Sequence, residues 1–278
     1  MRENEEMTQQ MEIICIGYEL LIGKILNTNA HWMAKRATSL GITVKRITVV
    51  GDDVDEIANA VKEALQRKPK FIITTGGLGP TFDDKTLEGI AKALNRKLEV
   101  NDKALAMVKE RYEAYAKEGK IEKAELTSAR VKMATLPEGA EPLPNPVGTA
   151  PGVQIIIDET FLIALPGVPS EMEAIFEQSI SPLLKKEAEG NMFFETSIYT
   201  EGIPESTLAP LIDQAMHDNP YVYIKSHPKG VEKKPHIELH ISTTAKDSKI
   251  ARERLGKTIA QLTELVQKSG GKIKVPKK

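Results

Sequence analysis

The chain has 278 residues, of which 41% are hydrophobic and 28% are charged. This composition excludes a disordered or fibrous chain, and the length suits two domains of ordinary size. The 38 Lys and Arg residues balance 39 Asp and Glu residues, so a net charge of -1 provides no global field for nucleic acid or an anionic membrane. The single cysteine, Cys15, excludes an internal disulfide and a cysteine-based zinc cluster.

The N-terminal segment is polar and acidic, unlike the basic and then apolar start of a signal peptide. No run approaches the roughly 18 apolar residues that a membrane-spanning helix needs. We therefore expect a disordered leader over residues 1–10, a cytoplasmic location and no membrane partner.

Apolar strands alternate with amphipathic helices after the leader. Continuous apolar runs predict strands that are buried on both faces, as in a parallel sheet. The predicted strands cover 12–17, 43–50 and 70–75, and the predicted helices cover 29–40, 54–67 and 86–94. This alternation predicts a doubly wound α/β domain, with a mostly parallel sheet and helices on both of its faces.

The pattern is less regular after residue 100. Two helices are predicted over 103–117 and 122–133, followed by a proline-rich segment over 136–152. Because proline fixes the backbone and removes a hydrogen-bond donor, we expect this segment to be an irregular loop. A long, stiff loop inside a compact domain is typical of a functional segment. A hairpin over 153–165 follows.

The order of elements changes from about residue 191. The sequence there predicts a βαββαβ pattern, which is typical of a ferredoxin-like split fold. We therefore expect a doubly wound domain over 11–188 and a smaller α+β domain over 189–278. The lysine-rich loop before residue 236 lacks a KH-type GXXG motif, so nucleic acid is not an expected partner.

The segment Thr74–Thr86 (TTGGLGPTFDDKT) joins a buried strand to a helix through several glycines. Turns at the carboxyl ends of parallel strands are where open sheets bind ligands, and glycine lets backbone amides approach a phosphate. The segment matches neither a P-loop nor a dinucleotide fingerprint, and the same glycines would also suit a plain strand-to-helix turn. The predicted phosphate-binding residues are Gly76, Gly77, Leu78, Gly79 and Thr81.

Acidic side chains follow the same strand ends. Asp83 and Asp84 follow the glycines, Asp52 follows the second strand, and Glu19 follows the first. Carboxylates repel a phosphate unless a cation lies between them, so the pattern indicates a divalent metal ion such as Mg²⁺, Mn²⁺ or Co²⁺. We expect Asp84, Asp52 and Asp83 to be metal ligands. For Asp52, a charge at a helix N-terminus is the alternative explanation.

Five motifs occur in a defined order along the first two thirds of the chain: YELLIG, GDD, GGLGPTFDDKT, NPVGTAPG and LPGVPSEM. Together they resemble the N-terminal region of CinA-type proteins, which is similar to the molybdopterin-binding domain of MoaB, MogA and MoeA. Tyr18 stands where that family commonly has Asp or Asn. The amidase domain at the C-terminus of many bacterial members is absent, so no amidase activity is expected.

The resemblance implies divalent-metal-dependent hydrolysis of a nucleotide diphosphate, with ADP-ribose giving AMP and ribose 5-phosphate. It makes Asp84 and Asp52 the catalytic residues. Relatives form dimers or trimers, so we expect a homo-oligomer. The further residues expected to contact the substrate are Glu19, Asn29, Asn145, Gly148, Thr149, Pro166 and Gly167.

Two other functions stay open. The first is a protein of molybdenum cofactor biosynthesis that binds or adenylylates molybdopterin. The second is a nucleotide-binding module without catalysis. The family preference for GGTG in pterin-pathway proteins, where this chain has GGLG, favours the hydrolase.

Overall fold

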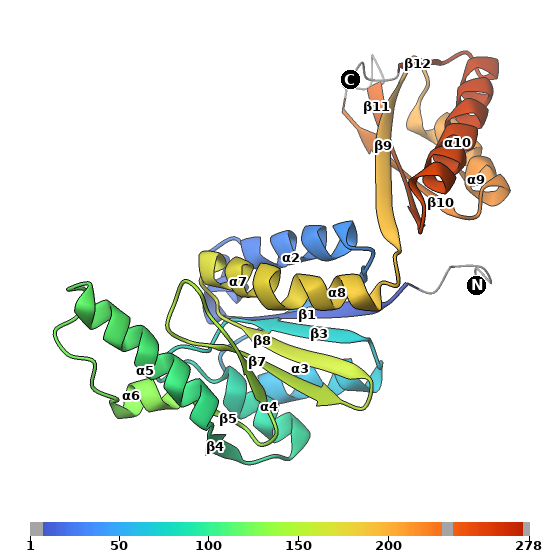
Figure 1. Ribbon diagram of the computed structural model, residues 1–278. Helices are drawn as coiled ribbons and strands as arrows, with labels where there is room; N and C mark the ends of the chain where they lie inside the picture. The colour runs from blue at the N-terminus through green and yellow to red at the C-terminus, as the bar shows by residue number, and fades with distance from the viewer. Residues whose placement is uncertain (1–7, 230–235, 275–278) are drawn as a thin grey trace. The chain divides into compact units, whose positions relative to one another are not determined.

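The structure is a computed structural model that describes residues 8–229 and 236–274 (Figure 1). The chain divides into two compact units, one formed by 9–38 and 42–187 and the other mainly by the residues from 188 onward. Residues 1–7 of the leader that was expected over 1–10 lie outside the described residues. Its last residue, Gln10, is already the first residue of a strand.

The larger unit contains a six-stranded sheet in the order β2-β1-β3-β8-β7-β6. The first four strands are parallel, and the last two pair antiparallel, which confirms the mostly parallel sheet. Residues Met11 to Ile16 of β1 and all of β3 are buried, as expected for central strands covered on both faces. The strand bounds are β1 (Gln10–Ile16), β2 (Thr43–Val50), β3 (Phe71–Thr75), β6 (Glu141–Leu143), β7 (Gly152–Ile157) and β8 (Thr160–Leu165).

Helices cover both faces of this sheet (Figure 1). One layer contains α2 (Thr28–Ser39), α7 (Pro169–Ile175), the π-helical turn η1 (Phe176–Ile180) and α8 (Ser181–Glu187). In it, the rings of Trp32 and Phe176 meet edge-on at 5.2 Å. The other layer contains α3 (Val54–Gln66) and α4 (Thr86–Leu94), whose apolar residues share a core with β1 and β3. The doubly wound class is therefore confirmed.

Three local predictions need correction. The helix predicted over 122–133 is only α6 (Ser128–Lys132), because the Thr127 hydroxyl accepts the Arg130 N–H and starts the helix there.

The proline-rich segment contains two short strands, β6 and β5 (Thr135–Pro137), and β5 pairs with β4 (Leu98–Val100). Short edge strands tolerate proline because the edge that faces away from the neighbouring strand needs no N–H donor. The segment after β1 forms a short helix, α1 (Tyr18–Leu21), that the sequence pattern did not indicate. The longer helix α5 (Asp102–Lys117) lies before α6.

The second unit confirms the βαββαβ pattern. Its strands form an antiparallel sheet in the order β10-β11-β9-β12, and apolar residues of both helices share one core with the strands. The part of the chain that the structure describes contains no helix long and apolar enough to cross a membrane. The element bounds are β9 (Met192–Glu201), α9 (Glu205–Asp218), β10 (Val222–Pro228), β11 (His236–Ala245), α10 (Ser248–Lys268) and β12 (Lys272–Lys274).

Candidate functional site

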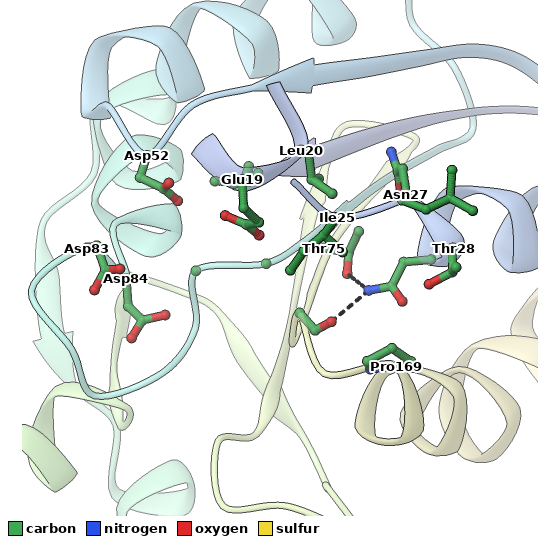
Figure 2. A pocket seen from close by; sticks show the side chains of 17 residues that line it. Glu19, Leu20, Ile25, Asn27, Thr28, Asp52, Thr75, Asp83, Asp84 and Pro169 are labelled. Atoms are coloured by element: carbon green, nitrogen blue, oxygen red, sulfur yellow. Dashed lines mark hydrogen bonds between the residues drawn. The ribbon is translucent and has the colours of Figure 1, made fainter. Parts of the chain in front are cut away.

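A cleft of about 280 Å³ opens where β1, β2 and β3 end (Figure 2). Its walls come from segments that directly follow these strands, from the start of α2 and from the turn before α7. This is the edge at which open parallel sheets bind ligands. The predicted site residues that line it are Glu19, Asn29, Asp52, Gly76, Gly77, Asp83, Asp84 and Gly167.

The turn between β3 and α4 depends on its glycines. Gly76 has a φ of 108°, and a Cβ there would lie 2.1 Å from the carbonyl oxygen of Ile16. Gly77 has a φ of 65°, and a Cβ there would lie 2.4 Å from Oγ1 of Thr86. The Thr86 hydroxyl donates to the Gly76 carbonyl at 2.7 Å and fixes the turn from inside. A side chain at either glycine would displace these contacts.

The amides of this turn are not equivalent. The Gly76 N–H donates to the carbonyl of Leu165 at 3.0 Å, so it is not available for a phosphate, in contrast to the prediction. Within the described residues, the N–H groups of Gly77, Leu78 and Gly79 meet no hydrogen-bond acceptor. Consecutive unpaired amides in a turn form an anion-binding concavity. The chemistry therefore points to Gly77–Gly79 as the part of the turn suited to an anion.

Thr81 does not line the cleft but orients the carboxylates beside it. Oδ2 of Asp84 accepts the Thr81 N–H at 2.8 Å and lies 2.6 Å from the Thr81 hydroxyl. The same hydroxyl also contacts Oδ1 of Asp83, and this hydrogen bond lowers the pKa of the Asp83 carboxyl. A phosphate contact was predicted for Thr81, whereas the structure gives its side chain a positioning role.

The three aspartates after β2 have different partners. Oδ2 of Asp52 accepts the Tyr18 N–H at 2.8 Å, and this carboxylate lines the cleft. Asp53 caps α3 by accepting the Asp55 N–H at 2.8 Å and the Glu56 N–H at 3.1 Å. These hydrogen bonds lower the pKa of Asp53. Asp55 forms an ion pair with Lys92. The helix-terminus explanation thus holds for Asp53, while Asp52 belongs to the cleft.

Asn29 ties α2 to the sheet at the bottom of the cleft. Its Nδ2 donates to Oγ1 of Thr75 at 3.0 Å and to the carbonyl of Gly167 at 2.9 Å. The Thr75 hydroxyl in turn donates to the Pro166 carbonyl at 2.8 Å, so Pro166 contributes a backbone acceptor and does not line the cleft. Oδ1 of Asn29 is buried and has no hydrogen-bond partner among the described residues.

The segment that contains Asn145, Gly148 and Thr149 does not reach this cleft. These residues line a separate hollow with Arg111 of α5, which shares no residue with the cleft. Nε of Arg111 donates to the Gly148 carbonyl at 2.9 Å. Nδ2 of Asn145 donates to the Glu171 carboxylate at 2.7 Å. The structure therefore uses the proline-rich loop as a fastened part of the fold rather than as a cover for the cleft.

The carboxylates of Glu19, Asp52, Asp83 and Asp84 lie on one side of the cleft, opposite Asn27, Thr28 and Pro169 (Figure 2). Across residues 8–229 and 236–274, no three His, Cys, Asp or Glu side chains are grouped closely enough to hold a metal ion. The predicted set of Asp52, Asp83 and Asp84 is therefore not a protein-only metal cage. Mg²⁺-like ions are commonly held by one or two carboxylates plus substrate phosphate, and this arrangement fits that mode.

Apolar side chains also line the cleft, and the sequence interpretation missed them. Ile25 and Leu26 lie in the loop between α1 and α2, where they are 55% and 81% exposed. Leu21 and Ile22 are exposed as well, and a group of exposed apolar side chains beside a polar cleft is typical of ligand sites. The available signal was the segment Leu20–Leu26 (LLIGKIL), which has five aliphatic residues interrupted by Gly23 and Lys24 and fits no amphipathic helix of ordinary length.

Comparisons with known proteins give consistent results. Residues 12–186 match the family model described as "Probable molybdopterin binding domain". A protein of Sulfurisphaera tokodaii is 45% identical over 263 residues, which cover 94% of this chain and 97% of that protein. A protein of Aeropyrum pernix is 46% identical over 262 residues, covering 94% and 95%. The crystal structure of the protein CinA, of unknown function, from Thermoplasma acidophilum is 40% identical with a TM-score of 0.57, covering 63% of this chain and 98% of that one.

Proposed function

The chain belongs to the family of probable molybdopterin-binding domains, and we propose from this premise that its cleft binds a phosphorylated small molecule of the pterin or nucleotide type. The carrying observation is that Gly77, whose N–H is unpaired, lines the cleft beside a group of carboxylates. The unpaired amides of Leu78 and Gly79 continue the turn away from the cleft, because these two residues line a neighbouring pocket. Amides alone would suit any anion. The carboxylates restrict the site to an anion that arrives with a cation.

Each group then has a defined task. The N–H groups of Gly77–Gly79 would hold phosphate oxygens, and the carboxylates of Asp84 and Asp52 would hold a divalent ion. The ion supplies charge neutralisation for the phosphate when it is bound. Thr81 keeps the Asp84 carboxylate in place through its N–H and hydroxyl, and the Tyr18 N–H does the same for Asp52. The ligand is thus held between donors and acceptors that are fixed before it binds.

Hydrolysis of a nucleotide diphosphate such as ADP-ribose is a second candidate function, which one observation favours. The Glu19 carboxylate lines the cleft and has no hydrogen-bond or ion-pair partner among the described residues. A carboxylate in this position can accept a proton from a water that attacks phosphorus. The phosphorus–oxygen bond between the two phosphates then breaks, which yields AMP and ribose 5-phosphate.

Calorimetric titration of the full chain with ADP and with neopterin triphosphate, in Mg²⁺ and in EDTA, tests the proposal. We expect binding in Mg²⁺ that weakens at least about tenfold in EDTA or in Asp84→Asn. Asparagine still accepts the Thr81 N–H, so the turn keeps its shape. Asp55→Asn, which alters a surface carboxylate outside the cleft, is the matched control and should bind like the wild type. A wild-type protein that binds neither ADP nor neopterin triphosphate in Mg²⁺ contradicts the proposal.

The same samples separate the two candidates. Release of AMP from ADP-ribose that stops in EDTA and in Glu19→Gln supports the hydrolase. Tight binding of the ligands with no release of AMP over hours supports binding without this reaction.

A further inference from the structure

A second pocket lies on the other side of the glycine turn. It has a volume of about 580 Å³ and is bounded by the turn, the start of α4, β4 and α6. Gly77 and Asp84 line both this pocket and the cleft, so the turn with the unpaired amides forms the wall between them. Neither the function proposed above nor the family model assigns a role to it.

The two hollows differ in size and chemistry. The cleft, at about 280 Å³, combines four carboxylates and backbone groups with several aliphatic side chains, and it lies just below the range of about 300–1,000 Å³ that is typical of complete ligand sites. The second pocket lies inside that range. Leucine and valine side chains provide the larger part of its lining surface, which suits a group that has little charge. The apolar residues that line it are Leu78, Leu87, Leu98, Leu126 and Val131.

The other side chains of this pocket are polar, and they include Asp84, which also lines the cleft. Ser128 and Thr135 contribute hydroxyl groups to the wall, and Glu88 contributes a carboxylate. Lys132 also lines the pocket, and its Nζ donates to the carbonyl oxygen of Thr81. An ammonium group beside the turn favours an anion at the turn, while an apolar cavity with a few hydrogen-bonding groups suits a heterocyclic ring. Leu98 and Leu126, each 37% exposed, would be covered by such a ring.

We infer that this second pocket holds the flat nitrogen heterocycle of the ligand. The ligand's phosphate lies over Gly77–Gly79, and its ring extends past Lys132 between β4 and α6. This inference rests on the proposed phosphate site and adds the location of the ring. It also explains why one turn separates a cleft that is rich in carboxylates from a more apolar pocket: the ligand has a charged part and a flat, weakly polar part.

A pair of adjacent substitutions tests the inference. Ser128 lines the pocket, whereas Ala129, the next residue of α6, does not. Both positions are exposed, so a tryptophan can be placed at either one without replacing a core residue. Ser128→Trp should fill the pocket, and Ala129→Trp is the matched control. Val131→Phe narrows the pocket from the same helix and provides a second variant.

The probes are ADP and neopterin triphosphate, which have a ring, and inorganic pyrophosphate, which has none, each titrated in Mg²⁺. We expect Ser128→Trp and Val131→Phe to weaken binding of the ring-bearing probe at least tenfold and to change pyrophosphate binding less than twofold. Ala129→Trp should bind all probes like the wild type. Whichever ring-bearing probe binds the wild type more tightly than pyrophosphate identifies the ring as a purine or a pterin.

Two results overturn the inference alone. In the first, both pocket-filling variants bind the ring-bearing probe with wild-type affinity. In the second, the variants lose affinity for the ring-bearing probe and for pyrophosphate to the same extent. Both leave the phosphate site intact as a proposal when pyrophosphate still binds the wild type. A wild-type protein that binds neither pyrophosphate nor either ring-bearing probe overturns the inference together with the proposed function.

Discussion

The main-chain N–H of Tyr18 donates a hydrogen bond of 2.8 Å to Oδ2 of Asp52, although 34 positions separate the two residues. The contact joins the segment after β1 to the segment after β2 and fixes the Asp52 carboxylate at the cleft. The Tyr18 side chain is 62% exposed and does not line the cleft. Position 18 therefore serves this contact through its backbone, and the tyrosine side chain takes no part in it.

Asp52→Asn should weaken Mg²⁺-dependent ligand binding without altering the fold. Asparagine retains an oxygen that accepts the Tyr18 N–H, but it removes the negative charge. We expect a loss in affinity of at least about tenfold, or about 1.4 kcal/mol, by calorimetric titration. Asp53→Asn is the control, because asparagine also caps helices well and Asp53 faces the start of α3. Equal affinities for the two variants would exclude a role of the Asp52 charge.

Asn29→Asp should destabilise the protein more than Asn29→Leu at neutral pH. Both variants lose the donors to Thr75 and Gly167, at a cost of about 1–3 kcal/mol. The Thr75 hydroxyl is already committed as a donor to Pro166, so an aspartate at position 29 would face acceptors only. Urea denaturation measures the difference between the two variants. Because the acceptors around position 29 favour the protonated carboxyl, the gap should narrow as the pH falls toward about 4. A leucine variant that is the less stable one would contradict this account.

Gly76→Ala should cost more stability than Gly23→Ala. Both glycines have positive φ, so alanine is strained at each by about 1 kcal/mol. Only at Gly76 does the added Cβ also meet a backbone atom, the Ile16 oxygen at 2.1 Å, whereas nothing lies within 4 Å at Gly23. We expect an additional loss of about 2 kcal/mol or more at Gly76, measured by chemical denaturation. Equal losses would show that the turn can relax.

Glu177→Gln should reduce stability at neutral pH and leave it unchanged in acid. Nη2 of Arg36 donates to Oε2 of Glu177 at 2.8 Å, and this hydrogen bond lowers the pKa of Glu177 below its ordinary value of 4.5. Because the folded-state pKa is lowered, the stabilisation is complete above about pH 4.5 and disappears as the pH falls through the lowered value. Melting temperatures of the wild type and the variant should therefore converge in acid. Glu173 has no ion pair among the described residues, so the difference in melting temperature between Glu173→Gln and the wild type should not shrink in acid in this way.

Much of the fold was predictable from local patterns. The continuous apolar runs of β1 and β3 indicated central parallel strands, and the predicted resemblance to CinA-type and molybdopterin-binding proteins is confirmed by the family model and by the Thermoplasma relative. Strand ends of a parallel sheet share one edge, which is why Glu19, Asp52 and Asp84 could be placed together without a structure.

The remaining features depend on contacts that the sequence does not reveal. The hydrogen bond of the Gly76 N–H to Leu165 removes one amide from the predicted phosphate site, and it joins residues 89 positions apart. Likewise, Arg111 and Glu171 hold the proline-rich loop away from the cleft, although its stiffness was a reasonable indication of a ligand contact. The pocket beyond the turn depends on α6, whose short length was not predicted.

The central claim is that the carboxylates and the glycine turn hold a cation and a phosphate together. Anomalous scattering from a crystal grown with Mn²⁺ and ADP tests it most directly. We predict a manganese peak within coordination distance of the Asp84 carboxylate and of an ADP phosphate oxygen, with that phosphate against the Gly77–Gly79 amides. A phosphate bound at this turn without manganese, or manganese bound only outside the cleft, would contradict the claim.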